Sequence, residues 1–85
     1  MTVFTAEYLL AGHHTGWPEG ELDQVLRASH YELHGFEGSW RSWKHPGDAR
    51  VLTLWMPPGT PVRRQYVEKV AKHLKELRER GEESV

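Results

Sequence analysis

Residues 38–46, GSWRSWKHP, bring aromatic rings, positive charges and an imidazole together in one short segment. Indole rings can stack on nucleobases, Arg and Lys can bind phosphates, and imidazole can move protons near neutral pH. Successive side chains of a strand point to opposite faces. If this segment is a strand, one face carries Arg41, Trp43 and His45, and the other carries Trp40, Ser42 and Lys44.

We assign Trp43 to the hydrophobic core, because aromatic side chains dominate the cores of small domains. Trp40 then lies on the opposite face, where two interpretations stay open. Its ring either packs against neighbouring side chains or stacks on a ligand, and stacking on a base is worth about 1 to 3 kcal/mol. The exposure of this ring decides between them.

The histidines suggest other chemistry. His45 and His73 could act together as an acid–base pair. However, His45 precedes Pro46 in a predicted turn, where its simpler role is to support the turn. The remaining histidines lack the cysteines or paired carboxylates that would complete a metal site; they are His13, His14, His30 and His34. We therefore expect no metal and no cofactor.

The elements that position these groups are predicted in the order strand, helix, three strands, helix, which is an α+β domain. Alternating apolar residues from Thr2 to Leu10 predict a half-buried first strand. Pro18 suits the first position of a helix that ends near Ser29. Strands over residues 31–36 and 40–45 follow, and the apolar run 51–56 has the pattern of a central strand covered on both sides.

The final helix is predicted with Thr60 as its cap and Pro61 at its first position. Apolar residues then recur at helical spacing until Gly81: Tyr66, Val67, Val70, Ala71, Leu74 and Leu77. We expect a single domain over residues 1–85, with the extra strand at 2–10, a core over 19–80 and a frayed acidic tail at 81–85.

The two halves of the chain carry opposite charge. Residues 1–38 hold six acids and one Arg, a balance of −5, whereas residues 39–80 hold ten bases and four acids, a balance of +6. Such asymmetry is expected of a protein with one side that faces a polyanion such as RNA, and equally of an ordinary solvated helix face.

Cysteine is absent, so the chain has no disulfide framework. The longest apolar run, residues 8–11, is too short to span a membrane, and the first residues lack the features of a signal peptide. We therefore expect a cytoplasmic protein without membrane contact. The absence of Asn and Ile and the excess of Arg over Lys fit a GC-rich genome and a possible thermophile.

These motifs resemble HicA, the small toxin of bacterial toxin–antitoxin pairs. The resemblance covers residues 21–77 and rests on the order of the elements and on Gly38-Ser39, Trp43, His45-Pro46 and Gly59-Thr60. It implies a fold similar to a double-stranded-RNA-binding domain, with an α-β-β-β-α core, as well as mRNA cleavage and a HicB-like antitoxin as partner. The chain departs from the family in three places, one of which is a third strand that looks longer than usual. HicA toxins carry their catalytic His directly after Gly-Ser, where this chain has Trp40, and they lack a counterpart of the strand predicted at 2–10.

Indole does not titrate near neutral pH, so Trp40 cannot replace an acid–base His. We therefore expect RNA binding without the family's catalytic His, through Trp40, Arg41, Lys44, Arg63, Lys69 and Lys72. One alternative is a protein-interaction module whose strand from Thr2 to Leu10 pairs with a second copy or a partner. Another is an mRNA-cleaving toxin with relocated catalytic groups, for which His45 is a candidate. Clustering of the bases beside an exposed Trp favours RNA, and scatter favours the interaction module.

Overall fold

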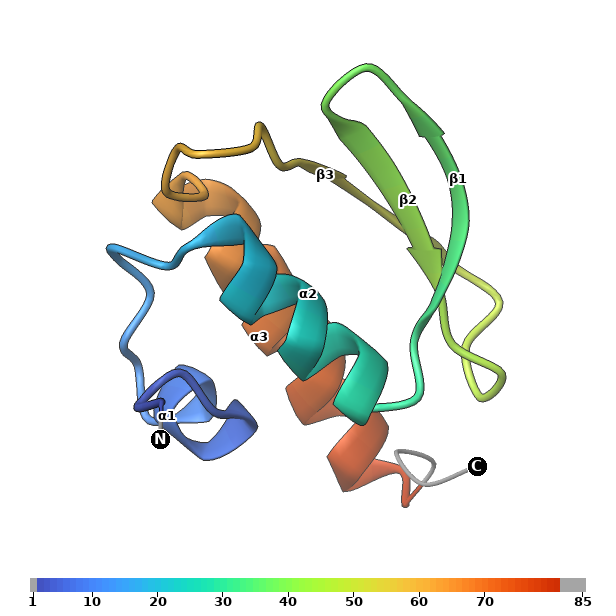
Figure 1. Ribbon diagram of the computed structural model, residues 1–85. Helices are drawn as coiled ribbons and strands as arrows, with labels where there is room; N and C mark the ends of the chain where they lie inside the picture. The colour runs from blue at the N-terminus through green and yellow to red at the C-terminus, as the bar shows by residue number, and fades with distance from the viewer. Residues whose placement is uncertain (1, 82–85) are drawn as a thin grey trace.

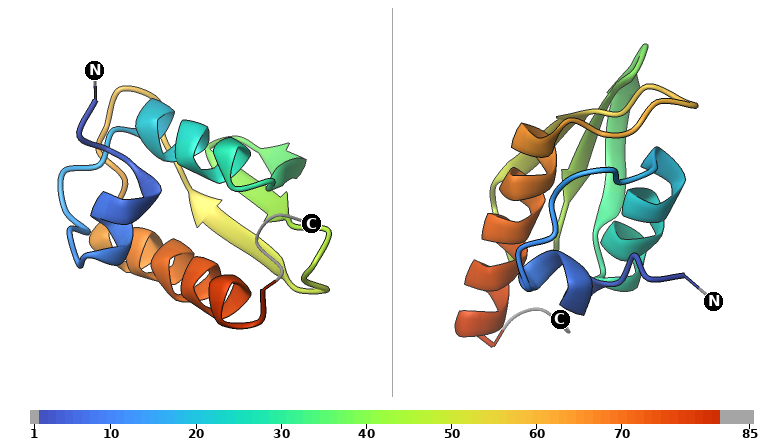
Figure 2. Two further views of the ribbon diagram at one scale, coloured as in Figure 1. Left: turned by 90° about the horizontal axis from the view of Figure 1, so that it is seen from below. Right: turned by 90° about the vertical axis from the view of Figure 1, so that its left-hand side faces the viewer.

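The computed structural model describes residues 2–81, which form three helices and one three-stranded sheet. In chain order these are α1 (Ala6–Leu10), α2 (Glu19–Ala28), β1 (Glu32–Glu37), β2 (Trp40–Lys44), β3 (Val51–Trp55) and α3 (Arg64–Glu79). The sheet is antiparallel in the order β1-β2-β3, and α2 and α3 lie on the same side of it (Figures 1 and 2). The predicted α+β class and the α-β-β-β-α order are confirmed. Most of the expected tail at 81–85 lies outside the described residues.

The core lies between the sheet and the helices. On β2 and β3 the inward side chains Trp43, Leu52 and Leu54 are completely buried, and Trp43 pairs directly with Leu52. The guanidinium of Arg27, on α2, lies 5.3 Å from the centre of the Trp43 ring. Trp43 is therefore a core residue, as its position in the alternating segment predicts.

A two-residue turn joins β1 to β2 and sets their register. Gly38 takes a φ of 59° at the first central position of this turn, a conformation that side chains with a Cβ rarely adopt. Glu37 and Trp40 consequently face each other as the last pair of the hairpin. Further along β1, a bulge between Leu33 and Gly35 leaves His34 without a partner on β2.

The strand predicted from Thr2 to Leu10 is wrong, because Ala6–Leu10 forms helix α1. The Thr5 hydroxyl caps this helix by accepting a hydrogen bond from the Tyr8 N–H at 3.1 Å. Phe4, Tyr8 and Leu9 pack around the buried Trp17 and the core instead of lining one face of a strand. Pairing of this segment with a second copy or a partner therefore has no strand to act through.

The prediction of a central strand covered on both sides at residues 51–56 is also wrong. β3 is an edge strand, and β2 is the central one. Leu52, Leu54 and Met56 are buried on the helix side, whereas Val51 is 44 % exposed on the other face. We call this other face of β2 and β3 the outer face. Because both helices lie on one side of the sheet, the apolar run is covered on that side alone.

Helix α3 begins at Arg64, later than the predicted start at Thr60 and Pro61. The N–H of Val62 donates to the Trp17 carbonyl at 2.7 Å, in an isolated antiparallel bridge. This pairing holds the residues before Arg64 in an extended conformation. The predicted apolar face of the helix is confirmed from Val67 onward, and Tyr66 is half-buried.

A buried carboxylate, Asp48, fixes the turn between β2 and β3. It accepts hydrogen bonds from the backbone and the guanidinium of Arg50, at 2.8 to 3.1 Å, and Arg50 also pairs with Glu76 on α3 at 3.0 Å. The hydrogen bonds from Arg50 lower the pKa of Asp48 from 3.8 to about 2. The turn is thereby held ionically to the helix that follows.

Asp48→Asn should lower the free energy of unfolding by about 1 to 2 kcal/mol at pH 7, because the folded state favours the ionised carboxylate. This loss is smaller than the full free energy that corresponds to the pKa shift, because Arg50 is 44 % exposed and solvent screens its charge. In the parent, this stability is present above about pH 4 and is lost as the pH falls toward 2. Urea denaturation at several pH values measures both effects.

Glu68→Gln is the matched control. It removes the exposed pair with Arg64 and should change the free energy of unfolding by less than about 0.5 kcal/mol. An acid-induced decline between pH 4 and 2 that is equally steep in Asp48→Asn and in the parent would contradict the role given to Asp48.

Candidate nucleic-acid interface

Trp40 begins β2 on the outer face of the sheet and is 45 % exposed. It lies directly across from Trp55 of β3, and its ring meets that of Tyr66 edge-on with centroids 5.9 Å apart. Trp40 therefore does not fill an interior hollow. Packing against Tyr66 accounts for part of the indole, and the exposed remainder is open to a ligand.

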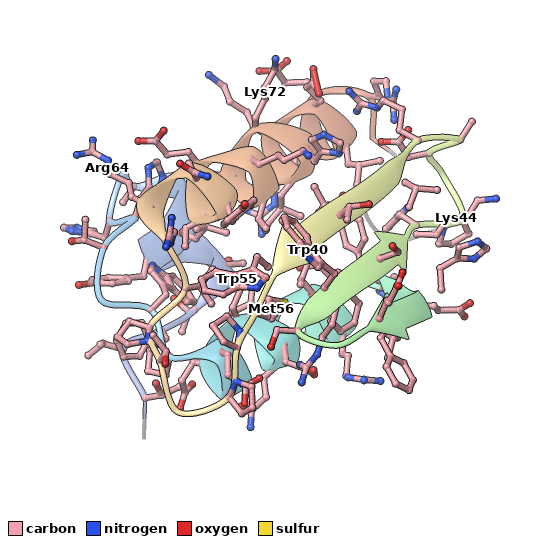
Figure 3. All side chains as sticks on the ribbon, turned by 90° about the horizontal axis from the view of Figure 1, so that it is seen from above. Trp40, Lys44, Trp55, Met56, Arg64 and Lys72 are labelled. Atoms are coloured by element: carbon pink, nitrogen blue, oxygen red, sulfur yellow. The ribbon has the colours of Figure 1, made fainter. Side chains whose placement is uncertain are left out.

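A cation lies beside this pair of tryptophans. The guanidinium of Arg63 is 4.9 Å from the centre of the Trp55 ring, within the range of a cation–π contact. Figure 3 shows Trp40 and Trp55 close together next to α3. We call the set formed by Trp40, Trp55, Tyr66 and Arg63 the aromatic surface.

Two residues of this surface, Trp55 and Tyr66, are absent from the predicted binding residues. Tyr66 is predicted only as part of the apolar face of the final helix, and Trp55 is not singled out at all. Trp55 lies in the apolar run 51–56, whose pattern predicts burial on both faces. Alternation along β3 places Trp55 on the same face as Val51, and the register places it opposite Trp40. Recognition of β3 as an edge strand would have identified it.

Only some of the basic residues predicted to bind RNA lie at or near the aromatic surface. Arg63 belongs to the aromatic surface, and Lys69 is exposed one turn of α3 after Tyr66. Lys44 lies at the opposite end of β2, and Lys72 points away from Trp40 on the other side of α3 (Figure 3). These two lysines therefore lie outside the aromatic surface.

Arg41 has a structural environment on the inner face. Its guanidinium pairs with Glu19 at 3.1 Å and Asp23 at 3.3 Å, and only 25 % of its side chain is exposed. Both acids belong to α2, so Arg41 joins the central strand to that helix. The aromatic surface does not include it.

The histidines considered for catalysis are enclosed. His45 is completely buried, and its Nδ1 accepts a hydrogen bond from the Gly47 N–H at 2.9 Å, which fits a role in the turn. His73 is buried on α3, where burial and the nearby Arg50 lower its pKa and favour the neutral form. Neither imidazole is presented to solvent as a nuclease acid or base would be.

Across residues 2–81, no three His, Asp or Glu side chains are grouped so that they could hold a metal ion together. None of the helices there has both the length and the apolar character needed to cross a membrane.

Comparison of the chain with protein-family models, with curated proteins and with solved structures gives no match. The likeness to HicA stays a prediction that rests on the motifs. Function must therefore be argued from the surface itself.

The two tryptophans of β2 should differ sharply in their effect on stability. Trp43→Ala should lower the free energy of unfolding by about 3 to 5 kcal/mol, because it leaves a cavity in the core. Trp40→Ala should lower it by less than about 1.5 kcal/mol, since nearly half of this residue is already in water. Chemical denaturation followed by circular dichroism measures both. Equal losses would contradict the two environments described for these side chains.

Proposed function

We propose that the protein binds single-stranded RNA on its aromatic surface and has no catalytic His there. The observation that carries this proposal is the half-exposed ring of Trp40, which lies across from Trp55 and beside the Arg63 cation. Proteins that bind single-stranded nucleic acid combine aromatic rings, on which nucleobases stack, with Arg and Lys side chains that hold the backbone phosphates. This surface has both components.

The geometry favours a single strand over a duplex. A base can stack on an indole only when its own face is unstacked, which holds for single strands, loops and ends. The aromatic surface offers Trp40 as the most exposed ring, with Trp55 partly covered by Arg63. These contacts support an arrangement in which one nucleobase stacks on Trp40 and the next nucleobase lies against Arg63 and Trp55.

The charges around the aromatic surface indicate the path of the RNA backbone. Glu37 lies directly across from Trp40 on β1 and repels phosphate on that side. Arg63 and Lys69 lie on the opposite side, before and within α3. The phosphates are therefore expected to follow the border between β3 and α3.

The resemblance to HicA agrees with this ligand class. By this resemblance, position 40 corresponds to the catalytic His of those toxins, so Trp40 would lie where that family binds RNA. Indole cannot exchange a proton with the 2′-hydroxyl near neutral pH, so the proposal retains binding and omits cleavage. A toxin with relocated groups has less support, because His45 is buried.

The test is a titration of labelled single-stranded RNA at several salt concentrations. If Arg63 and Lys69 each neutralise one phosphate, log affinity should fall with log salt with a slope of about −1.4. Trp40→Ala should weaken binding about tenfold or more at every salt concentration and leave that slope unchanged, because loss of stacking releases no ions. Lys69→Gln should reduce the slope by about 0.7.

Lys44→Gln is the matched charge control, because Lys44 is an exposed base at the other end of β2. It should leave both the affinity and the slope close to those of the parent. Absence of binding at low salt, or equal affinity of Trp40→Ala and the parent, would overturn the proposal. Metal-independent cleavage of the RNA would show that catalysis persists elsewhere.

A further inference from the structure

Strand β1 is the open edge of the sheet. β2 pairs with one side of it, and within residues 2–81 no other strand pairs with its second side. The opposite edge strand, β3, lies next to α3. An unpaired edge presents backbone donors and acceptors to which another extended chain can add.

The apolar side chains of β1 are exposed to an unusual degree. Phe36 is 75 % exposed and Leu33 is 36 % exposed, and both lie across from inner-face residues of β2. Edge strands are commonly protected by Lys, Pro or a bulge. β1, with the sequence ELHGFE, has a Glu at each end and the bulge at His34, but neither Lys nor Pro. The two acids lie on the outer face, so Phe36 on the inner face stays exposed.

The charge of β1 indicates what can pair with it. Glu32 and Glu37 stand at its two ends, and the strand has no Lys or Arg. In an antiparallel pair with β1 of a second copy, these acids would face each other, and like charges across a strand pair are destabilising. A strand with basic ends and an apolar centre is complementary.

The surface at the start of β1 is also hollowed. A cavity of about 680 Å³ is lined by Glu32, Leu33 and His34 of β1 and by residues 44–49 of β2 and the turn after it. A strand added to β1 can place a terminal side chain in this space. Lys44 faces Glu32 from β2, on the far side of β1 from an added strand, so Glu32 is the nearer charge to a side chain of that strand and suits a basic one.

We propose that the β1 edge binds an extended segment of a partner protein, with apolar residues against Phe36 and Leu33 and Lys or Arg opposite Glu32 and Glu37. The segment adds to the sheet as a fourth strand through backbone hydrogen bonds. This site borders the aromatic surface at Glu37 but uses none of its residues, and it does not depend on RNA binding.

Two synthetic peptides test the proposal. The probe is a seven-residue peptide of alternating valine and threonine with lysine at both ends, and the control has glutamate at both ends. The lysine-ended peptide should bind about tenfold or more tightly than the control, because like charges oppose the control. Amide chemical shifts measured by NMR during the titration should change most at residues 32–37.

Substitutions in β1 test whether the peptide binds at this strand. Phe36→Ala should weaken the probe about tenfold without loss of stability, since Phe36 is largely in water. The double variant Glu32→Lys with Glu37→Lys should prefer the glutamate-ended peptide.

Several results would overturn the proposal: no binding of either peptide at about 1 mM, shifts centred away from β1, or full binding by Phe36→Ala. A dimer in sedimentation that Phe36→Ala converts to monomer would assign the edge to a second copy instead of a basic partner. RNA binding by Phe36→Ala should equal that of the parent, so failure here is distinguishable from failure of the RNA proposal.

Discussion

The strict alternation of β2 around the buried Trp43 is the constraint on which the other features depend. Trp43 is enclosed between the strand partner Leu52 and the guanidinium of Arg27 from α2. A slip of one residue would expose this ring and bury the other face of the strand, so the register has a single favourable value. With Trp43 inward, Trp40 must face outward and Arg41 must face α2. The candidate RNA surface and the ionic contact with α2 both follow from the burial of Trp43.

The sequence predicted those elements whose pattern had one physical interpretation. Helix α3 repeats apolar residues every three or four positions, and α2 begins directly after Pro18 and ends at Ala28 with Ser29 as its C-cap. In β2, aromatic residues at positions of opposite parity required one ring inside and one outside. The class and order of the core elements follow from these patterns because burial of an amphipathic face dominates the choice of structure.

Local pattern was not sufficient where a distant residue determined the outcome. Phe4, Ala6, Tyr8 and Leu10 alternate as in a strand, yet the Thr5 cap and the buried Trp17 stabilise a short helix. The missed exposure of Trp55 depended on strand order, which the apolar run could not reveal. The sequence predicts Arg41 as a phosphate ligand, but in the fold it pairs with Glu19 and Asp23 of α2. In each case the deciding contact came from another segment of the chain.

The bridge between Trp17 and Val62 has a consequence for the order of folding. The β1–β2 and β2–β3 pairs close short loops, whereas this bridge joins segments far apart in the chain and closes a loop that contains the whole sheet. Loop closure costs entropy that grows with loop length, so the distant contact gains stability only after the enclosed hairpins have reduced the freedom of the chain. The segment that carries α1 and Trp17 is therefore expected to join a preformed sheet and α2 late in folding. The same segment should be among the first to detach in native-state hydrogen exchange, as a local unfolding unit distinct from the sheet.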